Sequence, residues 1–368
     1  MFNPAKPHNE LPLLPPKVDL ETKAVLRKCV GARTALAELK IAGQLIPDQT
    51  VLSSIPLLEA KVSSEIENIV TTHDAIFREA SLPDNRGDPS AKEAVRYRAA
   101  LYDAFRALAK RPISTRLAIE ICQKVKGVEL DIRTTPGTTL RNSQTGTIIY
   151  TPPEAHLLPN LLANWESFIN GPSDLDPVLR MAVQHYQFEA IHPFIDGNGR
   201  TGRILNVLVL IQDGLLELPI LYLSRYILAK RSEYYRLLGE VTTRGDWIPW
   251  LLYTLDGVEA TARWTTQKIR AIRTLMDATS DHLRERAPKI HSRELVELIF
   301  AQPYCRIADV VERGIAKRQA ASKYLQTLRE IGILLELPRL GDREKVFVNV
   351  RYRELLGAEH NVFEPLGT

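Results

Sequence analysis

The feature that most constrains this chain is a run of twelve residues from His192 to Arg203, with the sequence HPFIDGNGRTGR. Its three glycines have the spacing GxGxxG, which in dinucleotide-binding folds follows a buried strand within a βαβ unit. Here the preceding residues, MAVQHYQFEAIH, have helical character, so the dinucleotide-binding interpretation is weak. The run instead predicts a loop between two helices, about Pro177 to Ala190 and about Arg200 to Asp213.

A di-iron site is a second weak interpretation of the same region. Glu189 and His192 form a Glu-x-x-His pair, and His185 would share their helical face. A bundle di-iron site needs a second helix with this pair, and no other Glu-x-x-His occurs in the chain. The phosphate-binding pattern GxxxxGK[ST] is also absent.

Helical periodicity dominates the N-terminal third of the chain. We expect an extended arm over residues 1–20, then helices from Thr22 to Glu79 that are broken around Pro47 and Pro56. Apolar residues at helical spacing predict an amphipathic helix from Leu57 to Val70. A loop, Leu82 to Ser90, precedes another helix from about Lys92 to Lys110.

The middle of the chain, about Pro112 to Gly257, is mostly helical with one exception. Residues Arg141 to Pro153, RNSQTGTIIYTPP, combine a Thr-Gly-Thr turn with the β-prone residues that follow it. This pattern predicts a short hairpin or flap.

The C-terminal part has the pattern of a winged helix-turn-helix. A charged helical stretch, Arg263 to Arg286, leads to Pro288, and three short helices and two β-like runs around Gly341-Asp342 follow. The three helices are expected at Ser292–Phe300, Ile307–Arg313 and Lys317–Ile331. Lys317, Arg318 and Lys323 lie near the third helix, as in a DNA reader. No large excess of basic residues supports DNA binding. Docking of another protein and formation of a homodimer are at least as good explanations of the winged helix.

Composition sets the broad class. Lys and Arg number 48 against 44 Asp and Glu, a formal charge of +4 that does not by itself imply nucleic acid. The three cysteines show no metal-binding spacing, and a reducing compartment suits them. The most apolar stretch, Ile204 to Ile211, is too short to cross a bilayer. With no signal-peptide pattern at the N-terminus, we expect a cytoplasmic protein.

The twelve-residue run also carries the chemistry. Gly197, Asn198 and Gly199 precede a helix, where inward-facing N–H groups and the helix dipole bind anions. Arg200 and Arg203 lie in the first turn, where cations are unfavourable unless an anion compensates them. A planar guanidinium group can donate two parallel hydrogen bonds to two phosphate oxygens, so a polyphosphate is the natural ligand.

Two further residues complete this constellation. Asp196 would be repelled by phosphate unless Mg²⁺ lay between them. His192 titrates near neutrality and can accept a hydroxyl proton. Together these groups predict phosphoryl or nucleotidyl transfer. The alternative is that the histidine ends a helix and the arginines form structural ion pairs. This alternative explains less well why the histidine, the aspartate and both arginines occur within twelve residues.

The run resembles the Fic signature HPFx[D/E]GNGRxxR at every position. The similarity extends over roughly Leu11 to Gly257 and includes the flap, the segment LLANWESFIN, and SRYILAKRSEYYRLL at Ser224 to Leu238. The winged helix is similar to a common appendage of single-chain Fic proteins. The resemblance implies a mainly α protein with a Fic helical core, a β-hairpin flap and a C-terminal winged helix-turn-helix domain.

By this resemblance the chain is a protein adenylyltransferase that moves AMP from ATP to a Ser, Thr or Tyr hydroxyl and releases pyrophosphate. His192 would be the catalytic base and Asp196 the Mg²⁺ ligand. Arg200 and Arg203 would take the β- and γ-phosphates. The remaining ATP-site residues implied are Gly197, Asn198, Gly199, Thr201, Gly202, Asn206, Tyr234, Tyr235 and the flap residues Thr145, Gly146, Thr147 and Ile148. Tyr235 would border the adenine, and the flap edge would pair with the target protein.

A second family element lies upstream. Ser63 and Glu67 match the inhibitory pattern [S/T]xxxE[G/N] at an i,i+4 spacing on the expected helix. The resemblance implies that Glu67 pairs with Arg203 and inhibits the enzyme. An exposed acidic helix face is the ordinary explanation for such a residue.

We expect four parts: an N-terminal helical region at 1–111, a catalytic core at 112–257, a helical connector at 258–287 and the winged helix at 288–368. Other reactions at the same site stay open, namely removal of AMP or transfer of UMP or phosphocholine. So does a DNA-binding regulator whose Fic region senses nucleotide.

Overall fold

Helices dominate the computed structural model, which describes residues 2–46, 48–81, 88–135, 138–141, 145–338 and 345–364. The N-terminal half contains α1 (Lys23–Gly43), α2 (Gln49–Leu52), α3 (Ser54–Ile66), α4 (His73–Ser81), α5 (Pro89–Leu108), α6 (Thr115–Lys126), β1 (Leu140–Arg141), β2 (Ile148–Tyr150), η1 (Ala155–Leu157), α7 (Leu158–Asn170) and α8 (Pro177–Ile191). The C-terminal half contains α9 (Asn198–Gln212), α10 (Ser224–Ala229), α11 (Arg231–Arg244), α12 (Trp247–Arg286), η2 (Pro288–Ile290), α13 (Arg293–Ala301), β3 (Tyr304–Arg306), α14 (Ile307–Glu312), α15 (Arg318–Glu330), β4 (Leu335–Glu336), β5 (Val346–Val348) and α16 (Val350–Gly357).

Local sequence determines where several helices begin. Side-chain oxygens of Thr22, Ser114 and Asp176 accept hydrogen bonds from backbone N–H groups in the first turns of α1, α6 and α8. Such caps satisfy N–H groups that have no partner within the helix. The proline at the start of α8 loses nothing there, because the first N–H of a helix is unpaired in any case.

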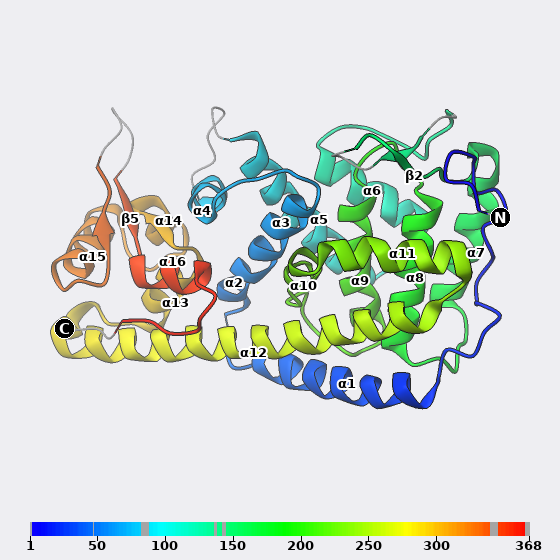
Figure 1. Cartoon of the computed structure of the whole chain (residues 1–368). Coiled ribbons are helices and arrows are strands. Elements are labelled where there is room, and N and C mark those ends of the chain that lie inside the picture. Colours follow the sequence, from blue (N-terminus) through cyan, green and yellow to red (C-terminus); the bar gives the residue numbers. More distant parts are fainter. Residues whose placement is uncertain are drawn as a thin grey trace.

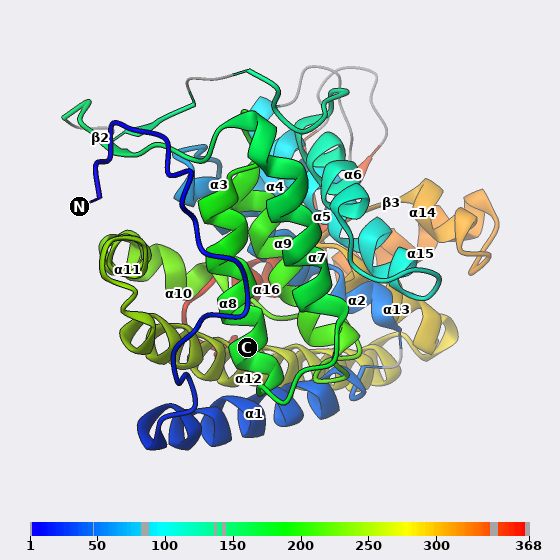
Figure 2. The same cartoon turned by 90° about the vertical axis from the view of Figure 1, so that its right-hand side faces the viewer.

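Helix α9 lies at the centre of the catalytic core. It packs against α8, α6, α5 and α3 (Figures 1 and 2), and its residues from Ile204 to Leu210 are buried. The most apolar segment of the chain therefore lies in a core helix. Among the described residues, no helix combines the length and apolarity needed to span a membrane.

Helix α12 runs along most of the molecule and joins the catalytic core to the C-terminal elements (Figure 1). Helix α1 packs along it. The boundary expected at Gly257 falls inside this continuous helix, so residues 258–287 do not form a separate connector helix. Gly257 has a packing function instead, because a Cβ there would lie 2.8 Å from the ring of Tyr226.

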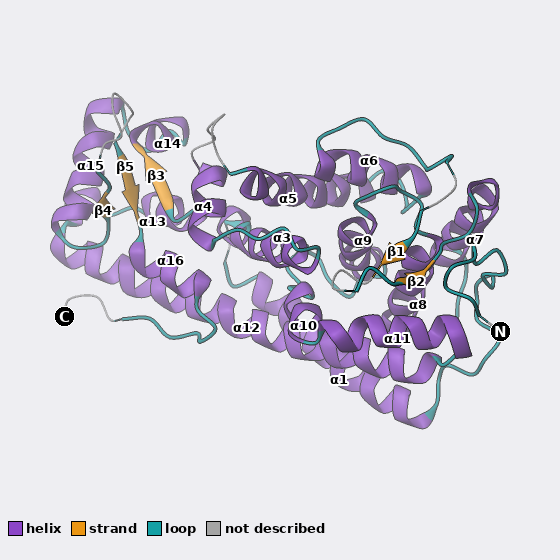
Figure 3. Cartoon of the chain, turned by 45° about the horizontal axis from the view of Figure 1, so that its top comes forward, coloured by secondary structure: helices purple, strands orange, loops and turns teal. Residues whose placement is uncertain are grey.

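Two small antiparallel sheets lie at opposite ends of the molecule (Figure 3). Strands β1 and β2 form the predicted flap, with Leu140 opposite Tyr150 and Arg141 opposite Ile148. Residues 142–144 of the flap lie outside the described residues. The N-terminal arm covers the base of this hairpin, where His8 N donates to Thr151 O at 3.0 Å and Phe2 stacks on Tyr150.

The C-terminal unit contains the expected three helices as α13, α14 and α15. Its sheet has the order β3-β5-β4. The expected turn at Gly341-Asp342 lies outside the described residues. Strand β3 and helix α16 were not expected from the sequence. Strand β3 is only three residues long, and its register opposite β5 depends on long-range pairing.

Helix α3 differs from the expected helix at its C-terminal end. It ends at Ile66, with Glu67 as its C-cap, whereas a helix to Val70 was expected. Asn68 adopts a left-handed conformation with φ 63°, and Ile69 N donates back to Ser64 O at 3.0 Å, which closes the helix. The helix is also buried around nearly all of its circumference rather than on one face.

Candidate active site

The backbone of His192 ends helix α8 in a left-handed conformation with φ 50°. A histidine adopts this region rarely, so surrounding contacts must fix it. Arg133 supplies them. Its Nε donates to His192 O at 2.9 Å, and its Nη2 donates to Pro153 O and to Ile191 O. This buried arginine was not found from the sequence, because it lies 59 residues before the motif.

The loop after His192 is closed by the side chain of Asn198. Its Oδ1 accepts from Phe194 N and its Nδ2 donates to Phe194 O, both at 2.8 Å. Gly197 turns the chain with φ 93°, and a Cβ there would lie 2.8 Å from Cys122 Sγ. Only glycine suits this position, on both conformational and steric grounds. The amide of Asn198 therefore holds the shape of the loop.

Helix α9 begins at Asn198 with no side-chain cap on its N-terminus. The N–H groups of the first turn have no side-chain acceptor from the cap position, and the helix dipole adds positive potential there. This arrangement is suited to an anion.

A cavity of about 640 Å³ opens in front of this N-terminus. Its lining combines the motif loop, the end of α3, the flap and the start of α11: Glu67, Asn68, Leu140, Arg141, Ile149, His192, Ile195, Asp196, Gly197, Asn198, Gly199, Arg200, Arg231, Ser232 and Tyr235. Its size is in the range of cavities that bind small ligands.

The titration near neutrality expected for His192 is wrong, because burial lowers its pKa to about 4, although the backbone of Glu189 opposes this shift. The imidazole is therefore neutral at pH 7. A neutral imidazole with a free ring nitrogen can accept a proton, as the role of a base requires. His192 lines the cavity, so a hydroxyl that entered it would find this acceptor.

Arg200 is buried and held by two carboxylates. It forms an ion pair with Glu93 of α5, and its Nη2 donates to Asp196 Oδ1 at 2.9 Å. Lys126 pairs with the same aspartate. Glu93 and Lys126 were not found from the sequence, since neither belongs to a motif. The carboxylates of Glu93 and Asp196 thus stabilise the Arg200 cation at the helix N-terminus.

Arg203 is buried and bound to α3. Its Nε donates to Ser63 Oγ at 2.8 Å, and its Nη2 donates to Ser63 O at 2.8 Å and Glu67 Oε1 at 2.9 Å. The family resemblance implied that Glu67 pairs with Arg203 and that Ser63 lies on the same helix. Gly199 permits the contact, because a Cβ there would collide with Glu67 Oε1 and lie 2.9 Å from Arg203 Nη1.

Several predicted nucleotide-site residues do not line the cavity. Thr201 is fully buried, and a Cβ on Gly202 would lie 2.5 Å from Glu189 Oε1, so Gly202 permits close packing of α9 on α8. Asn206 accepts from Gln184 Nε2 at 2.8 Å in the core. Tyr234 is buried, and its hydroxyl lies 2.9 Å from His185 Nε2. Its neighbour Tyr235 is 37% exposed and does line the cavity.

The flap borders the cavity through residues next to those predicted. Leu140, Arg141 and Ile149 line it. The predicted residues Thr145, Gly146, Thr147 and Ile148 lie at the turn and at the start of β2. Side chains alternate along a strand, which explains why Ile149 rather than Ile148 faces the cavity.

Two carboxylates line this cavity, and Asp196 is the one predicted to hold magnesium, because Glu67 pairs with Arg203. Its side chain is 60% exposed beside the uncapped helix N-terminus. Mg²⁺ is typically held by one or two carboxylates together with substrate phosphates and water. The donor set therefore fits the ion when a polyphosphate is present. Among the described residues, no cluster of three or more His, Cys, Asp or Glu side chains forms a metal site by itself.

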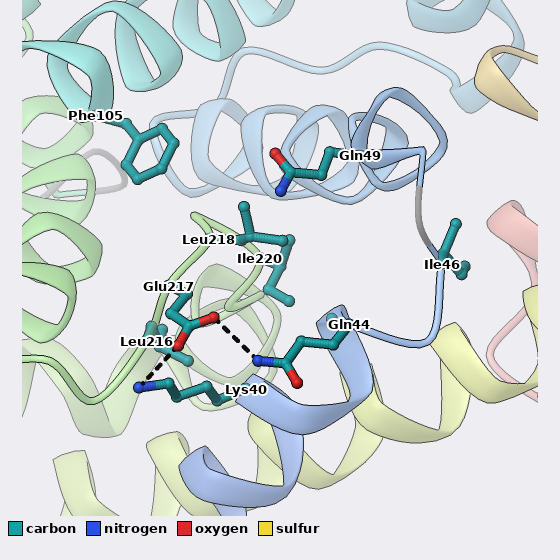
Figure 4. A pocket seen from close by; sticks show the side chains of 10 residues that line it. Lys40, Gln44, Ile46, Gln49, Phe105, Leu216, Glu217, Leu218 and Ile220 are labelled. Carbon is teal, nitrogen blue, oxygen red and sulfur yellow. Dashed lines mark hydrogen bonds and ion pairs between the residues drawn. The ribbon is translucent and has the colours of Figure 1, made fainter.

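A second cavity, of about 340 Å³, lies away from the motif, between α1, α2 and the segment that follows α9 (Figure 4). Its polar groups pair with one another. Lys40 Nζ lies 3.1 Å from Glu217 Oε1, and Gln44 Nε2 donates to Glu217 Oε2 at 3.1 Å. These pairs leave the carboxylate satisfied within the protein.

Comparisons with known proteins match three segments of the chain. Residues 26–106 match the Fic/DOC family N-terminal domain, and residues 112–210 match the Fic/DOC family itself. Residues 275–352 match the C-terminal domain described as protein adenylyltransferase SoFic-like.

The similar curated proteins are named adenylyltransferases. A probable protein adenylyltransferase of Aquifex aeolicus is 38% identical over 83 residues, which cover 23% of this chain and 26% of that protein. The protein adenylyltransferase Fic of Drosophila willistoni is 30% identical over 154 residues, or 40% of this chain and 30% of that protein. The matched segments thus span between a quarter and a third of these relatives.

Solved structures share the fold. A Fic family protein from Desulfovibrio desulfuricans superposes with a TM-score of 0.57 at 19% identity and covers 91% of this chain and 98% of that one. Fic-1 from C. elegans gives a TM-score of 0.51 at 23% identity, over 68% of this chain and 73% of that one. The solved structures show the fold, whereas the two matched Fic/DOC domains and the HPFIDGNGRTGR loop show that the chain belongs to the Fic/DOC family.

Proposed function

We propose that the chain is a protein adenylyltransferase that transfers AMP from ATP to a hydroxyl of a target protein and is inhibited by its own Glu67. The observation that carries the proposal is the cavity at the uncapped N-terminus of α9, which the neutral His192 and the buried Arg200 both line. The names of the curated relatives support the choice of AMP as the transferred group.

His192 is the base of the proposed reaction. It accepts the proton of a target Ser, Thr or Tyr hydroxyl, and the hydroxyl oxygen forms a bond to the α-phosphorus of ATP. The bond from that phosphorus to the oxygen bridging to the β-phosphate breaks, and pyrophosphate leaves with the electron pair. The neutral imidazole of the free protein is in the correct protonation state for this step.

The first turn of α9 binds the phosphates in this proposal. Its backbone N–H groups and the guanidinium groups of Arg200 and Arg203 supply donors for phosphate oxygens. Asp196 would hold Mg²⁺, which neutralises phosphate charge when it is bound. Lys126 and Arg200 pair with this aspartate in the free protein, so both cations lie within reach of an incoming polyphosphate.

Inhibition follows from the three hydrogen bonds that fix Arg203 to α3. While the guanidinium of Arg203 is hydrogen-bonded to Glu67, it cannot bind a γ-phosphate. A nucleotide that still binds would be displaced, and transfer tolerates little displacement of the reacting phosphorus. The flap edge is the proposed docking site for the target. The cytoplasmic location and the homodimer expected from the sequence stay predictions.

Intact mass spectrometry after incubation with ATP and Mg²⁺ tests the proposal. The wild-type chain and Glu67→Gly are compared, because self-modification reports activity without a known target. An added AMP on Glu67→Gly supports the proposal. An added phosphate alone would indicate a kinase, and no change in either chain would contradict the proposed reaction. Incubation with UTP or CDP-choline distinguishes the other transfers.

DNA binding by the C-terminal unit is a second candidate function. The open side of α15 presents polar and basic residues without a carboxylate, namely Arg318, Gln319, Ser322, Lys323 and Gln326, beside Ile307 of α14. The second helix of a helix-turn-helix reads base edges with such side chains. Retention of a random duplex library by the full chain, lost in the double variant Arg318→Ala, Lys323→Ala, would support it.

A further inference from the structure

The C-terminal unit contacts the segment that leads into α3. Tyr352 of α16 is fully buried, and its hydroxyl lies 2.8 Å from Ser54 Oγ, the first residue of α3, and 3.3 Å from Val51 O. Arg313 donates to Asp48 Oδ2 at 2.9 Å and to Thr50 Oγ1 at 2.7 Å, both at the start of α2. The beginning of α3 is therefore fixed by residues more than 260 positions away in the sequence.

The same unit contacts α4, the helix that follows α3. The hydroxyl of Tyr304 donates to Asp74 Oδ1, and Arg353 Nη1 lies 3.5 Å from the same carboxylate. The guanidinium of Arg78 lies 5.7 Å above the ring of Tyr304. In Figure 1, α2, α3 and α4 lie beside the C-terminal unit, between it and the catalytic core. The unit thus contacts the chain both before and after the helix that carries Ser63 and Glu67.

The C-terminal unit is itself fixed to the core through α12. Lys268 of α12 is fully buried, and its Nζ donates to Leu355 O at 2.5 Å and Ala358 O at 2.9 Å. These carbonyls lie at the end of α16, where a cation is favourable. Trp264 Nε1 also donates to Glu359 O at 3.2 Å. Helix α16 therefore has a defined position relative to the catalytic core.

We infer that the C-terminal unit is a regulatory domain that keeps α3 in its inhibitory position, with Tyr352 and Asp74 as the contacts that transmit this restraint. Glu67 reaches Arg203 only while the last turn of α3 keeps its position, because a hydrogen bond of 2.9 Å does not survive a displacement of about 1 Å. A partner that moves the C-terminal unit would therefore relieve inhibition. This inference rests on the proposed function, since it concerns the control of that site.

The test uses the full chain carrying Tyr352→Phe and Asp74→Ala together. The first change removes the hydroxyl and keeps the ring, which packs on Phe300 at 5.0 Å. The second removes the shared acceptor of Tyr304 and Arg353 at a half-exposed position. Arg329→Gln is the matched control. It breaks an ion pair with Glu336 inside the C-terminal unit without touching α2, α3 or α4.

Hydrogen exchange of residues 60–67 is the first measurement. The double variant loses the four polar contacts of Tyr352 and Asp74 described above. This loss predicts a roughly tenfold faster exchange, and no change is expected in Arg329→Gln. Unchanged protection in the double variant would overturn the inference, whatever the enzyme does.

AMP self-labelling is the second measurement, made with and without Glu67→Gly. The double variant is expected to label roughly tenfold faster than wild type, and to add nothing once Glu67 is absent. An equal increase in both backgrounds would overturn the inference, because the effect would then not pass through Glu67. Absence of labelling in Glu67→Gly alone would contradict the proposed function instead, and hydrogen exchange would still decide whether the C-terminal unit restrains α3.

Discussion

His192 combines a strained backbone with a neutral side chain. A left-handed conformation costs about 1 kcal/mol for a residue other than glycine, and Arg133 offsets it by binding three carbonyl groups around the turn. Because the backbone turns at this residue, the imidazole lines the cavity and does not continue the helix. Strain that the surroundings fix in this way is common at functional sites.

Replacing His192 by Ala should abolish AMP transfer and leave ATP binding nearly unchanged. The phosphates are expected to bind other groups, whereas a general base contributes about 10²–10⁴-fold to the rate. The comparison is best made in the Glu67→Gly background, with labelling measured by mass spectrometry and ATP affinity by calorimetry. A folded variant that labels at the same rate would exclude His192 as the base.

Arg203 connects two competing interactions. In the free protein it binds Glu67 and Ser63, and during transfer it would bind a phosphate. A buried pair between arginine and carboxylate contributes about 1.5–3 kcal/mol, which is enough to shift ATP between a productive and an unproductive position. The pair therefore has the strength that a switch requires.

Glu67→Gly should raise AMP labelling by roughly 10- to 100-fold, since 1.5–3 kcal/mol corresponds to that range. Arg203→Ala should label slowly whatever residue occupies position 67. The double variant decides between mechanisms. If Glu67→Gly activates the chain equally with and without Arg203, then the helix inhibits by a route other than this pair.

At the scale of elements, α3 shows the limit of periodicity as evidence. The apolar residues at helical spacing correctly indicated a helix near Ser63 and Glu67, and the family resemblance indicated their partner. The periodicity did not show that polar residues of this helix would also be buried. Glu59, for example, accepts from the backbone N and the hydroxyl of Ser224 at the start of α10. Such long-range partners are invisible to a pattern within one segment.

The flap should govern target choice more than nucleotide binding. Ile148→Pro removes a backbone donor at the start of β2 and should impair strand pairing with a target. Ile148→Thr is the control, because it keeps a β-branched residue at that position. We expect labelling of a target protein to fall at least tenfold in the proline variant, with ATP affinity unchanged. A proportionate loss of both would contradict docking at the flap edge.

At the scale of the whole molecule, the sequence predicted the class of fold and the motif but not how distant parts meet. Gly257 suggested a boundary because glycine is unfavourable within helices. In the structure it lies inside α12, since the adjacent ring of Tyr226 leaves no room for a Cβ. Arg133, Glu93 and Lys126 support the motif from other segments. A single sequence gives no signal that pairs such residues with the loop they contact.

Buried titratable groups should give the whole protein a stability maximum in mildly acidic solution. Burial lowers the pKa of His73 and His192 to about 4 and that of His185 to about 3. Between these values and about pH 6.5 the unfolded chain binds protons that the folded chain does not. Stability is therefore lost as the pH falls through this range.

Two buried carboxyl groups act in the opposite direction. Burial raises the pKa of Glu59 to about 7 and that of Glu189 to about 8. Above about pH 4.5 these groups ionise in the unfolded chain but stay protonated in the folded one. Stability is then lost as the pH rises to about 7 for Glu59 and to about 8 for Glu189, by up to about 1.4 kcal/mol per pH unit for each group.

The free energy of unfolding should therefore increase up to about pH 6.5, because the three histidines outweigh the two carboxyl groups below that pH, and should decrease from pH 6.5 to 8. Glu189→Gln tests the alkaline side, because the amide has nearly the same shape and does not titrate. Urea unfolding at pH 6.5, 7.2 and 8 should show a smaller decrease in this variant than in wild type. Glu217→Gln is the control, since that carboxylate is exposed and its pKa is lowered by Gln44 and Lys40. Equal slopes for Glu189→Gln and wild type would show that Glu189 is already ionised in the folded protein, and that the charge of Arg203 outweighs the cost of its burial.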